Sequence, residues 1–355
     1  MHMRIYKIAV INLGSTSTKI AYYENENCLF KDNIVHTARA LEGFSTIWEQ
    51  FEFRKQAIEA YLKEKGILIS GLDAVVTRGG HTEPIVGGVY RITRKMLEQS
   101  ASEKYGNHAT DLGLKLAYEF SAQGPQAFTV DPPTTDEFEP LARYSGLPQI
   151  KRRSSFHVLN HRAAGRQYAK DSGKDYRDLN LVVIHMGGGI SIAAHKKGRL
   201  VDANNAIDGD GPFSTNRCCS VPIGDLINMC YSGTYTYSEI RRLINGNAGL
   251  MAYVGENDVK TVEERAAAGD QACGEALDAM CYQIAKEVGA AATVLMGEVD
   301  AIVFTGGIAH SKRIVDSVSR RVSFIAPIAV YPGEYEMQSL GLNTLAALRG
   351  EEEIK

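Results

Sequence analysis

The feature that most constrains the fold is a strand–turn–strand plan that occurs twice in the chain. Residues 10–19, VINLGSTSTK, end an apolar strand in Asn, Gly and a row of small hydroxyls. Residues 180–202, NLVVIHMGGGISIAAHKKGRLVD, repeat the plan: an apolar strand, a polar residue, a Gly-rich turn and a second strand. Aligning Gly187 with Gly14 separates the copies by close to half of the 355 residues. Because the order of strands and turns is kept while the residues differ, we interpret the repeat as duplication of one domain.

The length and composition agree with two domains in an ordinary cytoplasmic protein. A chain of 355 residues exceeds the usual size of one hydrophobic core. Its net charge of -3 favours neither a nucleic-acid partner nor an anionic membrane. The N-terminal MHMRIYKIAVIN turns polar too soon for a secretory signal, and no run of about 18 apolar residues follows. The six cysteines form no CxxC pair, so we expect reduced thiols and no structural metal.

Strands and helices alternate in both halves, which is typical of an α/β fold. Helices are expected within about 46–65, 94–123, 223–246, 260–297 and 336–350. Strands are expected near 4–12 and in the two segments after it, and near 72–80, 126–131, 180–202, 299–310 and 323–334.

Five of these strands end in small or polar residues. They end at Asn12–Gly14, Arg78–Gly80, Asp131, His185–Gly189 and Thr305–Gly307. In open α/β sheets, ligands bind outside the carboxyl ends of the strands. We therefore expect the active site in a cleft between the two halves.

Three of these strand ends are Gly-rich turns that could hold phosphates. Glycine lets backbone N–H groups approach an anion, and small hydroxyls add donors without bulk. One such turn alone would more often be a simple tight hairpin, but three, two of them in corresponding positions, favour a nucleotide site. The pattern is not a GxxxxGK[ST] P-loop. The candidate phosphate ligands are Asn12, Gly14, Ser15, Thr16, Ser17, Lys19, His185, Gly187, Gly188, Gly189, Gly306 and Gly307.

The chain resembles the butyrate kinases, within the acetate kinase group of the actin-like ATPases. The resemblance rests on VINLGSTSTK, FHVLNHRAAGRQ, HMGGGIS, DGDGPFSTNR, FTGGIAHSK and YPGEYEM, which occur in order along the whole chain. It implies two ribonuclease H-like domains, residues 1–155 joined by the C-terminal helix 336–355, and residues 156–335. It also implies reversible transfer of the ATP γ-phosphoryl group to butyrate, giving butyryl phosphate and ADP.

The same resemblance assigns catalytic roles to four residues. Arg78 resembles the arginine that binds the substrate carboxylate, and Arg217 the one that clamps the transferring group; guanidinium forks suit both kinds of oxygen. Asp131 resembles the catalytic aspartate. Because a carboxylate substrate is already ionised near neutral pH, we expect Asp131 to position groups rather than act as a base. His157 resembles the histidine that donates to the phosphoryl oxygens, whereas His161, one helical turn later, is expected to pack.

The cofactors that the resemblance implies are ATP or ADP with Mg²⁺. Glu334, in YPGEYEM, resembles the magnesium-associated glutamate, with Asn12 as its companion. Thr305, Gly306 and Gly307 are expected to border the adenosine. The partners implied are a small carboxylate and further copies of the chain, as a homodimer or a higher homo-oligomer.

Other interpretations stay open on the sequence alone. The acid could be acetate, propionate or a branched acid, and the direction of the reaction and the oligomer size are not specified. A non-catalytic ATP-dependent sensor could share the fold, but no appended binding module is apparent. One departure from the family pattern bears on which acid is preferred. Relatives commonly carry Ser-Gly after the equivalent of Arg217, where this chain has Cys218-Cys219.

Overall fold

The computed structural model describes residues 4–355, which form two compact units. Unit 1 contains the chain up to Asp136 together with Tyr335–Lys355, and unit 2 contains Glu137–Glu334. The chain therefore returns to unit 1 with its last helix. The two units divide between Asp136 and Glu137. The domain boundary at residue 155 that the sequence analysis gave stays a prediction. Among residues 4–355, no helix is long and apolar enough to cross a membrane.

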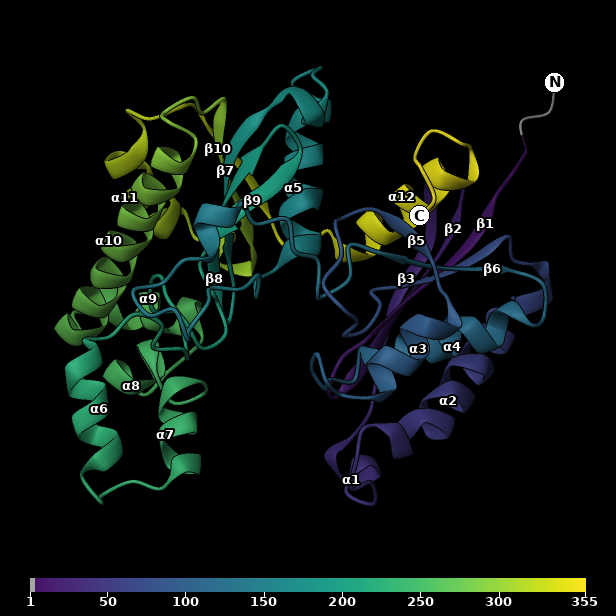
Figure 1. The fold of residues 1–355 in the computed structure, drawn as a ribbon, viewed down its shortest axis with the longest axis horizontal. Helices are drawn as coiled ribbons and strands as arrows, with labels where there is room; N and C mark the ends of the chain where they lie inside the picture. Colours follow the sequence, from purple (N-terminus) through teal and green to yellow (C-terminus); the bar gives the residue numbers. More distant parts are fainter. Residues whose placement is uncertain (1–3) are drawn as a thin grey trace. The chain divides into compact units, whose positions relative to one another are not determined.

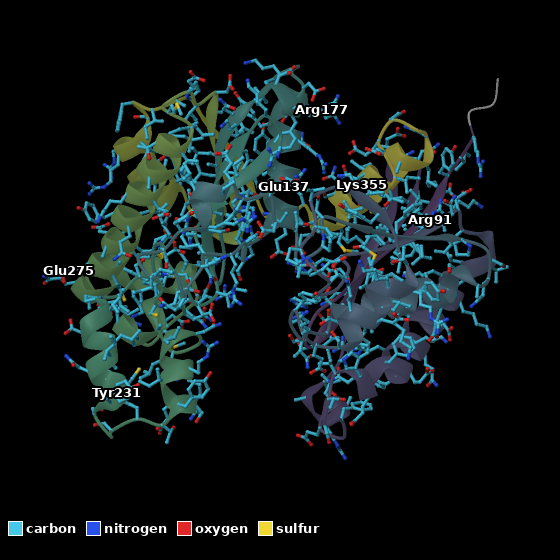
Figure 2. The ribbon with its side chains drawn as sticks, in the orientation of Figure 1. Arg91, Glu137, Arg177, Tyr231, Glu275 and Lys355 are labelled. Atoms are coloured by element: carbon cyan, nitrogen blue, oxygen red, sulfur yellow. The ribbon has the colours of Figure 1, made fainter. Side chains whose placement is uncertain are left out.

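Unit 1 is built on a six-stranded sheet in the order β3-β2-β1-β4-β6-β5. Its strands are β1 (Lys7–Leu13), β2 (Ser17–Glu24), β3 (Asn27–Val35), β4 (Ala74–Thr77), β5 (Val89–Arg91) and β6 (Gln126–Val130). The first three form an antiparallel meander, and β4 and β6 run parallel to β1. The short edge strand β5 was not anticipated. The end of the chain pairs with it, since Lys355 N donates to Val89 O at 2.9 Å; Figure 2 labels Lys355 and Arg91 of this strand.

Helices cover the two faces of this sheet. They are α1 (Ala38–Leu41), α2 (Phe51–Glu64), α3 (Arg94–Ala101), α4 (Asp111–Ser121) and α12 (Glu336–Leu348). Helix α4 packs on β1, β4 and β6, and α12 packs on the same strands from the other face (Figure 1). Strand β1 is buried along its length after Lys7 because both of its faces are covered.

Unit 2 repeats the plan with a five-stranded sheet in the order β11-β10-β7-β8-β9. Its strands are β7 (Asn180–Met186), β8 (Ile190–Lys196), β9 (Arg199–Ala203), β10 (Ala301–Gly306) and β11 (Ile328–Pro332). Strands β7 to β9 form the antiparallel meander, and β10 and β11 run parallel to β7. Read from the meander, the order β9-β8-β7-β10-β11 matches β3-β2-β1-β4-β6, as a duplicated domain requires.

The helices of unit 2 are α5 (Val158–Asp171), α6 (Ile223–Tyr231), α7 (Tyr237–Ile244), α8 (Gly249–Val254), α9 (Val259–Ala267), α10 (Gln271–Val294) and α11 (Lys312–Val322). Helix α10 packs on β7 and β8, and α5 packs on β7 and β10. Helices α6 and α7 form a hairpin at one end of the unit (Figure 1). The last strand begins at Ile328 rather than near 323, because α11 continues to Val322.

Candidate active site

Three of the predicted residues of unit 1 lie at one edge of its sheet. Strands β1, β4 and β6 are parallel neighbours in register, with Ile11 beside Thr77 and Thr77 beside Thr129. Their carboxyl ends therefore meet at the same edge. Asn12 lies at the end of β1, Arg78 follows β4 and Asp131 follows β6.

A carboxylate that the sequence analysis did not select joins two of these residues. Glu336, in the first turn of α12, accepts a hydrogen bond from Asn12 Nδ2 at 2.9 Å and lies 3.6 Å from Arg78 Nη1. Glu334, the acid chosen from YPGEYEM, is exposed and belongs to unit 2. The motif holds both acids, and Glu336 is the one that lies on α12. Among residues 4–355, no group of three or more His, Cys, Asp or Glu side chains is placed to hold a metal.

Asp131 is held rigidly in an unusual backbone conformation. It is 1% exposed and has φ of +44°, a region that few non-glycine residues adopt. Its carboxylate accepts a hydrogen bond from Gly88 N at 2.8 Å, and its own N–H donates to Gly88 O at 3.1 Å. Strained residues of this kind gather at functional sites.

The turn between β1 and β2 closes through one backbone hydrogen bond, from Gly14 N to Ser17 O at 2.8 Å. Ser15 and Thr16 are exposed at its tip, and the Ser15 hydroxyl bonds to His108 Nε2 at 3.2 Å. Burial first, and then the charge of Arg78, lowers the pKa of His108, so Arg78 lies near this turn. Lys19 pairs with Asn12 across the hairpin and shares its face of the sheet.

In unit 2, the ends of β7 and β10 also meet. His185 lies beside Thr305 in the parallel pair. Asn160, on α5, joins them, since its Nδ2 lies 2.8 Å from His185 Nδ1 and 3.2 Å from Thr305 Oγ1. The ring of His157, at the start of α5, stacks on that of His185 with centroids 3.9 Å apart. The two predicted histidines are therefore direct neighbours, and Asn160 is a residue of the site that the sequence analysis missed.

A buried chain of hydrogen bonds lies behind His157. Its Nδ1 lies 3.0 Å from Ser191 Oγ, which lies 2.7 Å from His161 Nε2. His161 Nδ1 lies 3.4 Å from His195 Nε2, and Tyr176 Oη lies 2.9 Å from His195 Nδ1. Burial lowers the pKa of His161 well below its usual value and that of His195 to about 3, so both are neutral. His161 packs in the interior, as expected.

Arg217 lies against the Gly-rich turn of unit 2. A Cβ on Gly189 would meet Arg217 Nη1 at 2.1 Å and the backbone oxygen of Ala206 at 2.9 Å, so glycine at this position lets the guanidinium lie against the turn. Arg217 Nη1 donates to Ala206 O at 2.5 Å, and burial lowers its pKa. Its Nε is buried without a partner in the described part of the chain. Ser214 ties the two segments, because its hydroxyl donates to Gly188 O at 2.6 Å and accepts from Arg217 N.

A cavity of 670 Å³ opens beside this turn, within roughly the 300–1,000 Å³ of small-molecule sites. Its lining includes the predicted glycines Gly187, Gly188 and Gly307. It also includes residues that no sequence signal singled out, in the segment from Asn257 to Lys260 at the start of α9 and at Asn216. Gly306 has φ of +88°, and a Cβ there would meet Met186 O at 2.3 Å. The close packing of β10 on β7 therefore requires glycine at position 306.

Cys218 and Cys219 face a different cavity, of 740 Å³, which Ile223 and Leu226 of α6 also line. Cys219 is buried with φ of +50°, and burial raises the pKa of its thiol to about 12. A thiol with so high a pKa is a poor nucleophile near neutral pH.

The chain is similar to known kinases along its whole length. The model of the acetokinase family matches residues 144–336. Butyrate kinase 2 of Clostridium acetobutylicum is 48% identical over 351 residues, 99% of each chain. A probable butyrate kinase of Bacteroides thetaiotaomicron is 48% identical over 347 residues, 97% of this chain and 98% of that one.

Solved structures confirm the predicted duplicated actin-like fold. Acetate kinase of Porphyromonas gingivalis superposes with a TM-score of 0.80 at 21% identity, covering 97% of this chain and 100% of that one. A propionate kinase of Francisella tularensis gives a TM-score of 0.75 at 18% identity, covering 95% and 98%. At these identities the likeness is one of fold alone.

Proposed function

Because this chain belongs to the acetokinase family of ATP-dependent carboxylate phosphotransferases, we propose that the acid it phosphorylates is butyrate. The products are butyryl phosphate and ADP, and the reaction is reversible. The observation that carries the proposal is the 48% identity with butyrate kinase 2 over 99% of both chains. The acetate and propionate kinases with similar structures are 21% identical or less, so they do not favour their own acids here.

In the proposed reaction, unit 1 binds the acid. The guanidinium of Arg78 pairs with the butyrate carboxylate, which reduces its repulsion from the phosphoryl group. Asp131, fixed by its two hydrogen bonds to Gly88, positions the groups around it. No proton has to leave the acid, because a carboxylate is ionised near neutral pH. One carboxylate oxygen attacks the γ-phosphorus, and the bond from that phosphorus to the β,γ-bridging oxygen breaks.

Unit 2 is proposed to bind the nucleotide in its 670 Å³ cavity, along Gly187, Gly188 and Gly307. The glycine turns offer backbone N–H groups to the phosphates. Arg217 and the stacked pair His157 and His185 neutralise the charge that develops on the transferring group.

The residues present fit the proposed Mg²⁺. Asn12 uses its Nδ2 as a donor to Glu336, and its amide oxygen accepts no hydrogen bond from residues 4–355. Amide and carboxylate oxygens are ligands that Mg²⁺ prefers, usually with several waters. Asn12 would hold the ion with Glu334, as the sequence predicts, or with Glu336 through water. When bound, the ion neutralises charge on the phosphate oxygens.

We also propose that the protein is cytoplasmic and that a second copy covers the α6–α7 hairpin. The hairpin exposes large apolar side chains, and Tyr231, at the end of α6 in Figure 2, is 88% exposed. The exposed set is Ile223, Ile227, Met229, Tyr231, Tyr235 and Tyr237. Patches of this kind mark association sites. The mass in solution, by light scattering, tests this: Ile223→Asp should dissociate the oligomer, and a wild-type monomer would contradict it.

Acyl phosphate formation, trapped as hydroxamate, tests the function. The enzyme is offered acetate, propionate, butyrate, isobutyrate and valerate with ATP and Mg²⁺. We expect the highest kcat/KM with butyrate. A maximum at another acid would move the specificity within the family, and no product from any acid would overturn the kinase proposal.

A further inference from the structure

A buried arginine lies directly beneath the turn between β1 and β2. Arg54, on α2, is 1% exposed. Its Nη1 donates to Gly14 O at 2.8 Å and lies 3.5 Å from Ser17 O. Its Nη2 donates to Ser15 O at 2.7 Å, and its Nε donates to Gln50 Oε1 at 3.0 Å. Both terminal nitrogens of the guanidinium therefore hold this one turn against α2, and Nε is held by Gln50.

All of these acceptors are neutral, so the charge of Arg54 has no counter-ion. No Asp or Glu within residues 4–355 forms an ion pair with it. Burial lowers the pKa of Arg54, and no acidic group counteracts this. The charge of Arg54 contributes to lowering the pKa of His36 and, after larger causes, that of His108. A buried cation without a partner is costly, so an anion that binds beside it is strongly stabilised.

The turn above Arg54 presents unused donors on its outer side. In a trans peptide unit, the C=O and the following N–H point in opposite directions. Since the carbonyls of Gly14 and Ser15 point at Arg54, the N–H groups of Ser15 and Thr16 point away from it. In the described part of the chain, these two N–H groups donate no hydrogen bond, and both residues are exposed. Adjacent N–H groups of this kind form an anion-binding concavity.

Resting on the proposed kinase function, we propose that Arg54 is a positioning residue for the phosphate chain of the substrates. It fixes the Gly14–Ser17 turn with its N–H groups outward, and its uncompensated charge finds its counter-ion in the phosphates that bind there. Arg54 does not touch the phosphates, because the turn lies between them. No sequence motif contains it, since it lies in the first turn of an ordinary helix, α2.

Equilibrium binding to the full chain tests the proposal with three probes that differ in phosphate content: tripolyphosphate, ADP and adenosine. Arg54→Met removes the charge and the donors at similar volume. Lys55→Met is the matched control, because Lys55 is the next residue of α2 and is paired with Glu119 at 2.7 Å. We expect Arg54→Met to weaken the affinity for tripolyphosphate and for ADP by tenfold or more, and to leave the affinity for adenosine within twofold of wild type. Lys55→Met should leave all three affinities within twofold of wild type.

A folded Arg54→Met variant, judged by circular dichroism, with wild-type affinity for tripolyphosphate would overturn the proposal. If that variant does not fold, the wild-type protein decides. With serine and threonine labelled by ¹⁵N, tripolyphosphate should shift the amide signals of Ser15 and Thr16, and unchanged signals would overturn the proposal. Failure of the kinase function is seen separately, as no acyl phosphate from wild-type protein with any acid.

Discussion

The two units share one strand order but hold different chemistry at the corresponding edges of their sheets. In unit 1, the edge carries charged groups, Arg78, Asp131 and Glu336, with Arg54 buried beneath the turn. In unit 2, the edge carries an amide, a hydroxyl and imidazoles, and Arg217 reaches the turn from a loop. Duplication has kept the backbone plan, while each copy carries its own set of polar side chains at the edge. The difference predicts that substitutions in the two units act on different substrates.

Substitution of Arg217 should have the largest effect. If unit 2 stabilises the transferring group, Arg217→Ala lowers kcat by about a hundred- to a thousandfold, as for loss of one transition-state donor. The KM for butyrate should change little, because that acid is assigned to unit 1. Steady-state kinetics with both substrates varied measures these changes. Arg241→Ala is the control, because Arg241 lies in the same unit and forms an ion pair with Asp208. A loss confined to the KM for butyrate would reverse the assignment.

Arg78 provides the converse test in unit 1. Arg78→Ala should raise the KM for butyrate by roughly thirtyfold or more, because a charged hydrogen-bonding partner of the carboxylate is lost. The KM for ATP should stay within about threefold, and Arg78→Lys should recover part of the loss since it keeps the charge. Arg91→Ala, on edge strand β5, is the control (Figure 2). Equal effects on both KM values would mean that the units do not divide the substrates.

Acid should weaken unit 2 more than unit 1, because unit 2 buries the neutral pair His161 and His195. Burial lowers the pKa of His195 to about 3. Below about pH 6.5 the unfolded chain takes up a proton there that the folded chain does not, so the free energy of unfolding falls with pH. Above about pH 6.5 the free energy of unfolding keeps its full value, and by pH 5 each such histidine has lowered it by about 2 kcal/mol.

The single tryptophan, Trp48, separates the two units in this measurement because it lies in unit 1. Urea unfolding is followed at pH 8 and pH 5 by Trp48 fluorescence, which reports on unit 1, and by circular dichroism, to which unit 2 also contributes. Between pH 8 and pH 5, the urea midpoint seen by circular dichroism should fall further than the midpoint seen by fluorescence. His195→Gln should reduce the shift seen by circular dichroism. Coincident transitions at both pH values would show that the units unfold together.

The sequence predicted what depends on local pattern and missed what depends on side chains meeting across the fold. The strand ends at Asn12, Arg78, Asp131, His185 and Thr305 follow from apolar runs that stop at polar residues, and the parallel pairings place them at common edges. The contact of Glu336 with Asn12 could not be predicted, because it depends on the residue at which α12 begins. Asn160 and Arg54 lie inside helices, where nothing local distinguishes a ligand from a packing residue.

The smallest predicted effect compares two strained residues, one in each unit. Asp131 and Cys219 both have positive φ, but only Asp131 uses its side chain to fix the conformation, through Gly88. Cys219→Ala and Cys219→Gly both remove the thiol, but only glycine adopts this conformation freely. Cys219→Gly should therefore be more stable than Cys219→Ala by about 1 kcal/mol, or roughly 2–4 °C in Tm by calorimetry. The matched pair at Asp131 should instead lose activity in both variants. Equal stability of the two Cys219 variants would mean that the surrounding loop relaxes and stores no strain.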